Sequence, residues 1–570
     1  GEIMPRKKIN SHQFQEVLEQ DDFGNSSEIE ELSDDEMGDI TVVNIPDEAK
    51  DDDTFEAKTE NVKWEKTPFT PSGIPVEDFC TPMELVCNDE HEPLSPLNYF
   101  TNFFTKDFIE NVAEKTNMFY MQNTGKNLNV TPGEIQTLIG IHIEMGTVTY
   151  PQLRLYWGQT RRYDLIADAM TFNRFSNLRN NLHMVNNLDH DVNSTDKFWK
   201  VRPIMDKFLE VISKENVKPI LCVNEQMIPF RGKLTLKQFV RGKPIPWGIK
   251  LFFLCSEGGM PYNFMAYQGK SNIIPEEYKD LGLGGAIVMS LVKGRVEKES
   301  NYNLFIDNFF TSPILINKLL EYGTFCTGTV RANRIGKPPI KSIKDLKSDG
   351  RGAMDGCTST DGNMCLVKWN DNNIVNLLSS AYDWEKSAQV RRWDKVKKER
   401  IDVKCPSGII HYNKGMEGVD QLDFYLALYR IHIKSKKWTL RVIFHFVDLG
   451  VIVSWLQYKR DCESSGVPSK EQKSLLQFRL ELAEAVINAG SNSLKVSNKK
   501  SRNYFHCSPG EDVRYDGIGH FPEWRNERQR CRYCSHNHSR AASHTFCIKC
   551  NVHLCINSRR NCFLDYHKRS

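Results

Sequence analysis

The sequence predicts an α/β core set within helical segments and followed by a small cysteine-rich module. From about residue 94 to 219, and again after residue 418, apolar residues recur every three or four positions, as on one face of a helix. Between these stretches, short apolar runs that end in a polar residue indicate buried strands with interspersed helices. Six of the 16 cysteines lie within the last 40 residues.

The first 74 residues form an acidic leader that we expect to be disordered. Residues 21–60 contain 16 Asp and Glu but only two Lys, whereas the whole chain is nearly balanced, with 75 basic and 73 acidic residues. Apolar residues are too sparse in the leader to repay the entropy of ordering it. The rest of the chain is therefore basic, and this asymmetry favours a polyanionic partner.

Cysteine usage and targeting signals indicate the compartment. The chain begins without an apolar signal-peptide core, and ten cysteines are scattered singly before residue 531, which is typical of reduced intracellular thiols. The longest apolar stretch, Val442–Trp455, is interrupted by His445 and Asp448 and is too short to cross a membrane. Basic runs at Pro5–Lys8 and Lys499–Arg502 are candidate nuclear-import signals. We therefore expect a nuclear protein without a membrane span.

The helical pattern before residue 219 is clearest in two places. Apolar residues at helical spacing form one face, made of Leu97, Phe100, Phe103, Phe104, Phe108 and Val112. Thr131–Glu134 predicts a second helix start, because Thr, Pro and Glu stand where an N-cap, a first helical position and a capping-box partner belong. Further helices are expected at Met170–His183 and Phe198–Ile212.

Residues 220–333 are expected to form the α/β core. Strands are predicted at 218–224, 250–255, 263–267 and 304–307, and helices at 275–281, 290–298 and 313–322. Residues 334–405 are turn-rich and basic, with strand-like runs at 364–369 and 374–378, and we interpret them as an inserted module. The core is expected to resume over residues 406–429, with helix from about 418 to 460 and from 471 to 489.

Three places in the predicted core, which we call stations, carry polar side chains that could bind a metal ion. Asn224 and Asp307 each end a predicted strand, while Asp420 and Asp423, three residues apart, share one face of a predicted helix. Acidic residues gathered from two strands and a helix can hold two Mg²⁺ ions for phosphoryl transfer. Scattered Asp residues are more often helix caps or solvated, so the spacing alone does not establish a catalytic site.

Longer motifs around these stations resemble the catalytic blocks of piggyBac-type transposases. They are Val223–Lys233 with Gln238–Pro244 and Gly248–Lys250, then Phe305–Ser312 and Thr327–Arg331, and finally Tyr412–Asp423 with Lys436–Trp438. The resemblance covers about residues 90–570. It implies a ribonuclease-H-like catalytic core inserted in a helical dimerisation and DNA-binding domain, which would be split into residues 75–219 and 430–505.

At the first catalytic position this chain departs from the family pattern, because Asn224 stands where the family has Asp. An amide is neutral and offers one carbonyl oxygen, so a metal site there loses a negative charge and a bridging oxygen. The neighbouring Glu225 is expected to face the opposite side of its strand. Asp307, Asp420 and Asp423 match the family, so a weakened single-ion Mg²⁺ site is the most that we expect to remain.

The terminal cysteines predict a zinc module over residues 528–570, after a linker over 506–527. Two CxxC pairs in an intracellular chain are a strong zinc signal, because thiolates at this spacing can share one ion. The candidate ligands are Cys531, Cys534, Cys547, Cys550, Cys555, Cys562 and His567. The family resemblance implies a cross-braced module that holds two zinc ions and reads transposon ends.

Within that resemblance, we assign the seven ligands to two ions. Cys531, Cys534 and Cys555 are expected at one ion, and Cys547, Cys550, Cys562 and His567 at the other. The eighth ligand is open among His536, His538, His544 and His553. A ribbon with a single zinc ion is the alternative.

Basic side chains near the motifs are candidates for contact with DNA phosphates. Lys434, Lys436, Lys437 and Arg441 are expected to lie close together on one helical segment. A second basic group, residues 391–400, surrounds Trp393 at the end of the inserted module.

Together these observations favour a domesticated, homodimeric protein that is derived from a piggyBac-type transposase and binds double-stranded, transposon-end-like DNA. Cleavage is expected to be defective because of Asn224. The rival hypothesis is an enzyme that still cuts and joins DNA at TTAA targets, as the family does. The third is a protein-interaction scaffold for which DNA no longer matters.

Overall fold

The structure is a computed structural model that describes residues 62–71 and 93–568 apart from short gaps. The gaps are residues 192, 241–242, 244, 270–273, 299–300, 395–396, 500–513, 538 and 540, and only the backbone is described for residues 492–499. The predicted disordered leader lies outside the described residues except for 62–71, where Trp64–Glu65 form a strand that pairs with Thr358–Ser359, so the expected disorder is wrong for this part. The candidate import signals, Pro5–Lys8 and Lys500–Arg502, also lie outside them.

The described chain divides into two compact units. The first contains the residues up to Leu94, Thr195–Lys197 and Ile204–Leu475, and the second contains Ser95–Ser194, Phe198–Pro203 and the residues from Leu476 onward. Each unit is therefore assembled from segments that lie far apart in the sequence.

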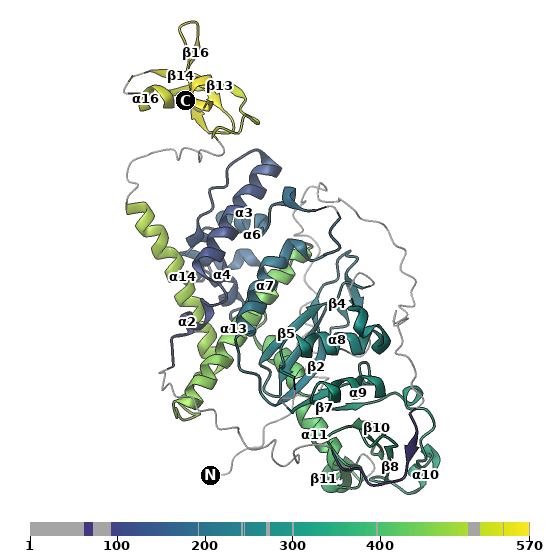
Figure 1. The fold of residues 1–570 in the computed structure, drawn as a ribbon. Coiled ribbons are helices and arrows are strands. Elements are labelled where there is room, and N and C mark those ends of the chain that lie inside the picture. The colour runs from purple at the N-terminus through teal and green to yellow at the C-terminus, as the bar shows by residue number, and fades with distance from the viewer. Residues whose placement is uncertain are drawn as a thin grey trace. The chain divides into compact units, whose positions relative to one another are not determined.

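A ten-stranded mixed sheet organises the first unit (Figure 1). The strand order is β1-β8-β9-β10-β7-β6-β2-β4-β3, and β5 also pairs with β4. The strands are β1 (Trp64–Glu65), β2 (Ile220–Pro229), β3 (Lys237–Phe239), β4 (Trp247–Ser256), β5 (Pro261–Ala266), β6 (Tyr302–Ile306), β7 (Thr324–Thr329), β8 (Met354–Ser359), β9 (Cys365–Asn370) and β10 (Ile374–Ser379). β2, β6 and β7 are parallel, and the other neighbouring strands are antiparallel.

The four predicted core strands are present as β2, β4, β5 and β6, within two or three residues at most of their ends. The exception is β2, which runs on to Pro229 because its residues stay buried between two covered faces. Residues 334–405, interpreted as an inserted module, contribute β8 to β10 to the same sheet through the pairing of β10 with β7. The strands β11 (Ser387–Asp394) and β12 (Glu399–Pro406) form a separate ribbon.

Helices cover both faces of the sheet. Phe264 on β5 packs against Phe446 of α13 (Trp438–Ser464) and Phe208 of α7 (Arg202–Ile212). Its neighbour Asn263 donates from Nδ2 to the carbonyl oxygen of Leu291 in α8 (Gly282–Lys293). Because successive side chains on a strand point to opposite faces, α7 and α13 cover one face and α8 covers the other.

Four shorter helices complete the first unit: α9 (Pro313–Glu321), α10 (Ile343–Ser348), α11 (Ser407–Gly415) and α12 (Gly418–Leu428). The expected continuous helix over residues 418–460 is wrong, because α12 and α13 are separate. Between them the chain turns, and the amide of Ile431 donates to the carboxylate of Asp448 in α13 at 2.8 Å. The helix expected at 290–298 lies earlier, as α8.

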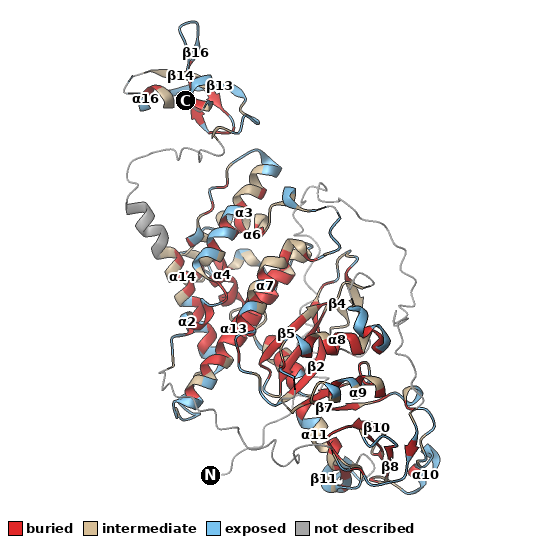
Figure 2. Cartoon of the chain, in the orientation of Figure 1, coloured by how far each residue is buried: buried red, intermediate tan, exposed pale blue. Residues whose placement is uncertain are grey.

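The long helix α13 lies in the core of the first unit (Figure 2). Within the described part of the chain, it alone has the length and mean hydropathy of a membrane-crossing segment, and 83% of the most apolar window is buried inside the unit. Its apolar character is therefore explained by packing against the sheet and neighbouring helices.

Helices make up most of the second unit. They are α2 (Pro96–Phe100), α3 (Lys106–Thr124), α4 (Pro132–Thr147), α5 (Asp164–Ala167), α6 (Phe172–Asn181) and α14 (Leu475–Lys499). The capping box predicted for α4 is confirmed, with the hydroxyl of Thr131 accepting from the amide of Glu134 and the Glu134 carboxylate accepting from the amide of Thr131. α13 clusters with the sheet instead of with these helices, so the predicted helical domain of 75–219 plus 430–505 stays a prediction.

α4 and α14 pack at very close range, although they lie more than 300 residues apart in the sequence. A Cβ atom built on Gly140 would lie 2.8 Å from Cγ1 of Ile487, and one on Gly490 would lie 2.4 Å from Oγ1 of Thr137. Glycine at both positions therefore lets the two helix backbones approach each other.

The carboxyl-terminal module contains small sheets and short helices. Its elements are β13 (Pro522–Arg530), α16 (Arg532–His536), β14 (Ala542–Cys547), β15 (Val552–His553), β16 (Ile556–Asn557), β17 (Arg560–Asn561) and α17 (Cys562–His567). Six cysteines form most of its buried centre, with Val552, Leu554 and Tyr566. Strand β13 begins at Pro522, inside the range predicted as a linker, so the folded module begins earlier than residue 528.

Candidate functional site

Two neighbouring parallel strands bring the first two predicted stations together. In the β2–β6 ladder Val223 lies opposite Ile306, so Asn224 and Asp307 follow side by side. Helix α12 packs on β2 and β4 and supplies Asp420 from its first turn and Asp423 three residues later. The predicted stations therefore converge on one acidic centre.

Glu225 also belongs to this centre, through a contact with Lys243, although adjacent residues of a strand point to opposite sides. The strand alternation holds, since Glu225 pairs across the ladder with Phe252 and Asn224 pairs with Phe253. However, the ammonium of Lys243 lies 3.3 Å from Oε1 of Glu225 and 3.9 Å from Oδ1 of Asp420. The β2–β6 ladder ends before Glu225, and Lys243 joins the two carboxylates there.

The carboxylates at this centre are held in an unfavourable charged state. Burial raises the pKa of Asp307, the charge of Glu225 raises it further, and a hydrogen bond from the amide of Phe309 at 2.8 Å opposes the change. Burial likewise raises the pKa of Asp420, and it raises that of Asp423 to about 6. A positive charge placed among these groups would relieve this cost.

The one positive charge that contacts two of these carboxylates in the described structure is Lys243. Burial opposes its charge, but Glu225, Asp420 and Asp423 together raise its pKa. The donor set of carboxylate oxygens with the amide oxygen of Asn224 is the kind that Mg²⁺ prefers. Lys243 thus takes the position that a cation would fill in such a set.

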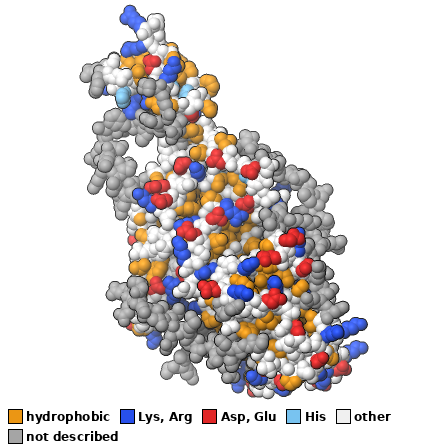
Figure 3. Space-filling model, viewed as in Figure 1, with side chains coloured by type: hydrophobic (Ala, Val, Ile, Leu, Met, Phe, Trp, Pro, Cys, Tyr) orange, Lys and Arg blue, Asp and Glu red, His pale blue; other side chains and the backbone are white. Residues whose placement is uncertain are grey.

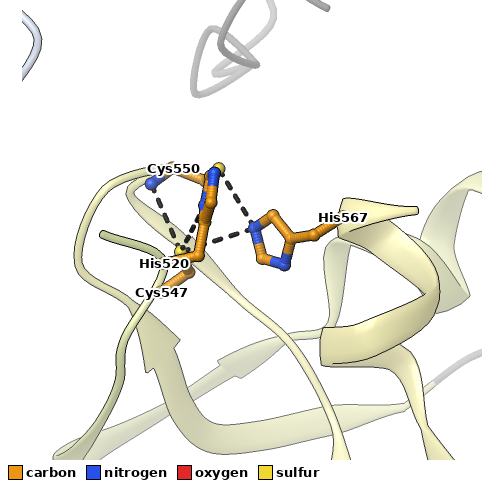
Figure 4. A group of neighbouring side chains, drawn as sticks. All are labelled: His520, Cys547, Cys550 and His567. Atoms are coloured by element: carbon orange, nitrogen blue, oxygen red, sulfur yellow. Dashed lines mark hydrogen bonds between the residues drawn. The ribbon is translucent and has the colours of Figure 1, made fainter. Parts of the chain in front are cut away.

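Two sets of four metal-type ligands lie in the carboxyl-terminal module. One comprises Cys531, Cys534, Cys555 and Cys562, and the other comprises His520, Cys547, Cys550 and His567 (Figure 4). Within each set the ligand atoms all lie within 4.8 Å of one another. In Figure 4 the imidazole of His567 points from α17 toward the two sulfurs.

The spacing of these atoms fits tetrahedral zinc. With Zn–S of about 2.3 Å and Zn–N of about 2.0 Å, neighbouring ligand atoms of a tetrahedral ion lie roughly 3.5–3.8 Å apart. The Sγ atoms of Cys534 and Cys562 are 3.5 Å apart, and Sγ of Cys547 is 3.5 Å from Nε2 of His567. Sγ of Cys550 lies 3.4 Å from Nδ1 of His520. Both sets can therefore close around an ion with little movement.

The two sets correct the sequence-based assignment in two ways. Cys562 joins Cys531, Cys534 and Cys555, although we expected it at the other ion with His567. The eighth ligand is His520, which lies in the predicted linker ahead of the first CxxC pair, where no spacing motif marks it.

The histidines proposed for the eighth position have other surroundings. The Nδ1 atoms of His544 and His553 bond to carbonyl oxygens of Arg525 and Ser543. His536 is exposed, and His538 lies outside the described residues.

A hydrogen bond at the outer ring nitrogen orients each of the two imidazoles, His520 and His567. Nε2 of His520 lies 3.0 Å from Oδ1 of Asp516, which leaves Nδ1 for the cysteine pair. Nδ1 of His567 bonds to the carbonyl oxygen of Phe563 at 2.7 Å, which leaves Nε2 for the same pair. A carboxylate or carbonyl that holds the outer nitrogen is the usual support of a metal-binding histidine.

The predicted DNA-contact residues do not share one helix. Lys434, Lys436 and Lys437 lie in the turn before α13, and Arg441 lies on α13 itself. Lys434 and Lys436 are exposed, whereas Lys437 and Arg441 are half-buried. The helical expectation failed here because α13 begins only at Trp438.

Fold and sites together define an α/β protein with an acidic centre at parallel strand ends and a separate metal-type module. The family model described as Transposase IS4 matches residues 95–455. The human PiggyBac transposable element-derived protein 3 is 30% identical over 522 residues, which cover 89% of this chain and 81% of that protein. The human PiggyBac transposable element-derived protein 2 is 29% identical over 482 residues, covering 84% and 77% respectively.

A solved structure shares the fold. The chain of the piggyBac transposase synaptic complex with hairpin DNA superimposes with a TM-score of 0.57 at 23% identity, covering 81% of this chain and 95% of that one. This chain belongs to the piggyBac-type transposase family.

Proposed function

We propose that the protein is a nuclear, homodimeric DNA-binding protein, derived from a piggyBac-type transposase and defective in DNA cleavage. The observation that carries the proposal is the state of the acidic centre, where Asn224 replaces a carboxylate and Lys243 joins Glu225 to Asp420. The family's fold and the basic body are retained around a centre that has lost part of its negative charge.

The strand order supports a ribonuclease-H-like core. Along β5-β4-β2-β6-β7, an antiparallel set of three strands continues into two parallel strands. Asn224 and Asp307 directly follow the last residue pair of the parallel β2–β6 ladder, although β2 itself runs on to Pro229, and α12 brings Asp420 and Asp423 to the same place. A divalent metal held there would stabilise the charge that develops on a phosphate under attack.

The cleavage defect follows from the residues present. The amide of Asn224 brings no charge, and its oxygen accepts a hydrogen bond from the amide of Glu225 at 2.9 Å. The ammonium of Lys243 neutralises part of the negative charge that should hold a cation. Losing one carboxylate from a phosphoryl-transfer centre is expected to cost about 10²–10³-fold or more in rate, because such catalysis is mainly electrostatic.

Two zinc ions are proposed for the module, one for each ligand set. The donor atoms are sulfur and imidazole nitrogen at tetrahedral spacing, which favours Zn²⁺ over Mg²⁺ or Ca²⁺. Double-stranded DNA is proposed as the partner from the net charge of the body. Homodimerisation, transposon-end-like sites and nuclear location are proposed from family membership.

The test pairs a binding assay with a cleavage assay on the full chain. A fluorescent duplex of about 40 base pairs should bind with an affinity that falls steeply between about 50 and 200 mM salt. Nicking of transposon-end DNA with Mg²⁺ or Mn²⁺ should be absent for the unmodified chain. Asn224→Asp should restore part of it, and Asp307→Ala in that background should abolish it again.

A second candidate function is residual cleavage and joining at TTAA targets, and the presence of Glu225 at the centre favours it. Nicking by the unmodified chain that is lost in both Asp307→Ala and Glu225→Gln would establish this candidate and overturn the cleavage-defective proposal.

A further inference from the structure

The ribbon of β11 and β12 is anchored by one face and exposed on the other. Val403 and Cys405 on β12 are buried in a cluster with Trp369, Leu377 and Ile409. This cluster fixes the ribbon to the first unit through its inner side. The outward-facing residues therefore stand on a ribbon that is held in place from its other side. They do not form part of the buried cluster.

The outward face of the ribbon is mainly cationic and carries an exposed tryptophan. Three cross-strand pairs form it, Gln389 with Lys404, Arg391 with Asp402 and Trp393 with Arg400. Trp393 is 54% exposed, which is unusual for so large an apolar side chain. The lysines Lys397 and Lys398 are exposed at the turn.

The charge of the ribbon is strongly unbalanced. Residues 387–406 contain seven Lys and Arg against three Asp and Glu. The ion pair between Arg391 and Asp402 is long, at 3.8 Å, and both side chains are well exposed, so it neutralises little. Figure 3 shows blue Lys and Arg side chains over the part of the first unit that Figure 1 labels β11.

The inner side of the same ribbon reaches the acidic centre. Arg392 on β11 lines a hollow of about 330 Å³ together with Tyr412, Asn413, Met416, Glu417 and Asp420. The guanidinium of Arg392 lies over the ring of Trp369 and 3.7 Å from the carboxylate of Asp371, which orients it. The inner side of the ribbon therefore adjoins the hollow that contains Asp420.

We propose that the outward face of β11–β12 is a DNA-contact surface that holds a duplex. A two-stranded ribbon has the width that the major groove of DNA admits. Arg391, Arg400 and Lys404 contact phosphates, and Trp393 makes an apolar contact with base edges in the groove. The excess of cations over acids selects a polyanion over a protein surface of mixed charge. This inference rests on the proposed DNA binding and adds where the contact lies.

The test compares two triple variants of the full chain that remove the same charge. Arg391→Gln with Arg400→Gln and Lys404→Gln strips the ribbon. Lys337→Gln with Lys344→Gln and Lys347→Gln strips three exposed lysines at or near α10. Binding of a 40-base-pair duplex is measured by anisotropy from about 50 to 200 mM salt. The ribbon triple should weaken binding at least tenfold and lower the salt slope by about two to three, whereas the control should change affinity less than threefold.

Trp393 gives an independent readout. Trp393→Ala should weaken binding about five- to tenfold without changing the salt slope, because an apolar contact releases no counterions, and Trp393→Phe should recover part of the loss. Melting temperatures of all variants should match that of the unmodified chain, since these side chains point outward.

The outcomes separate this inference from the proposed function. If the unmodified chain binds the duplex and the ribbon triple behaves like the control triple, the inference is overturned while DNA binding stands. If the unmodified chain binds no DNA, both fall. If the ribbon variants bind DNA normally but lose a protein that co-purifies with the unmodified chain, the ribbon is a protein interface and the inference is overturned.

Discussion

At the scale of single residues, the acidic centre differs from a simple deletion of one charge. Asn224 removes a carboxylate from β2, yet Glu225, the next residue, directs its own carboxylate to Lys243. Lys243 then meets Asp420 on the other side. The centre is therefore stabilised without a bound ion, and a divalent cation has to displace the ammonium before it can enter.

Exchanging Lys243 tests this competition. Lys243→Gln removes the resident charge, so the full chain should bind Mn²⁺ about tenfold more tightly, as measured by the loss of the free-ion signal in electron paramagnetic resonance. Glu225→Gln should instead weaken Mn²⁺ binding by a similar factor, because a carboxylate is lost from the set. Lys293→Gln is the matched control, since Lys293 pairs with Glu277 on the surface. Weaker binding in Lys243→Gln would contradict the competition.

At the scale of elements, the close contact of α4 and α14 decides whether replacing a glycine raises or lowers the free energy of unfolding. Alanine in place of helical glycine normally stabilises by about 1 kcal/mol. At Gly490, however, a Cβ would lie 2.4 Å from Oγ1 of Thr137 and 2.5 Å from the carbonyl oxygen of Gly133, so the steric cost prevails. We expect Gly490→Ala to lower the free energy of unfolding by about 1–3 kcal/mol, as measured by denaturant titration.

The control for this substitution is Asn488→Ala, at an exposed position of α14. It should be neutral or stabilising by a few tenths of a kcal/mol, since only helix propensity changes. Equal stability of Gly490→Ala and Asn488→Ala would show that the two helices can separate without cost.

His142 on α4 makes the second unit sensitive to acid. Burial, together with the charge of Arg179, lowers its pKa to about 3, whereas an unfolded histidine titrates near 6.5. Between these values the unfolded chain binds the proton and the folded chain does not, so stability falls as the pH drops below about 6.5. At pH 5 the loss is about 2 kcal/mol.

His142→Phe isolates this contribution because an aromatic ring can keep the stacking on Phe175. The variant has a smaller difference in unfolding free energy between pH 7.5 and pH 5 than the unmodified chain, by about 2 kcal/mol. An unchanged pH dependence would mean that the imidazole titrates normally in the folded state.

Local sequence signals predicted where helices and strands lie better than they predicted which strands pair with each other. Thr131 and Glu134 predicted the start of α4 correctly, because a capping box lies within four consecutive residues. The apolar runs that precede Asn224 and Asp307 marked β2 and β6, and the adjacency of these two strands followed only from family resemblance. The extension of the sheet by β8 to β10 was missed, since pairing with β7 joins residues about 50 positions apart.

The candidate sites show the same limit. Cys531 and Cys534 were found as a pair because CxxC is a local motif, and so were Cys547 and Cys550. His520 was missed because it approaches Cys547 only through the fold, across 27 residues. The same is true of Glu225, whose strand position predicts its direction but not the reach of Lys243.

At the scale of the whole molecule, the two ligand sets interleave along the chain. Along the chain, one set takes His520, then Cys547 and Cys550, and finally His567. The other set takes Cys531 and Cys534 from between the first two of these positions, and Cys555 and Cys562 from between the last two. No segment completes a site by itself. We therefore expect metal binding and folding of the module to be coupled.

Metal removal tests this coupling. The full chain should contain two Zn per chain by elemental analysis, and a chelator should melt the module while leaving the circular dichroism of the rest of the chain mostly unchanged. His520→Ala should lower the zinc content to about one, as should Cys547→Ser, whereas His544→Ala should keep both ions. A full zinc content in His520→Ala would exclude the eighth ligand assigned to that set.

The interleaved ligands also make the end of the chain a shared vulnerability. Helix α17 begins with Cys562 and ends with His567, so it delivers one ligand to each set. A stop codon, a frameshift or a protease cut just before Cys562 would remove this one helix and yet leave both sets with three ligands. Quality control in the cell would then meet an unfolded tail of exposed thiols, so a very small lesion at the terminus should behave like loss of the entire module.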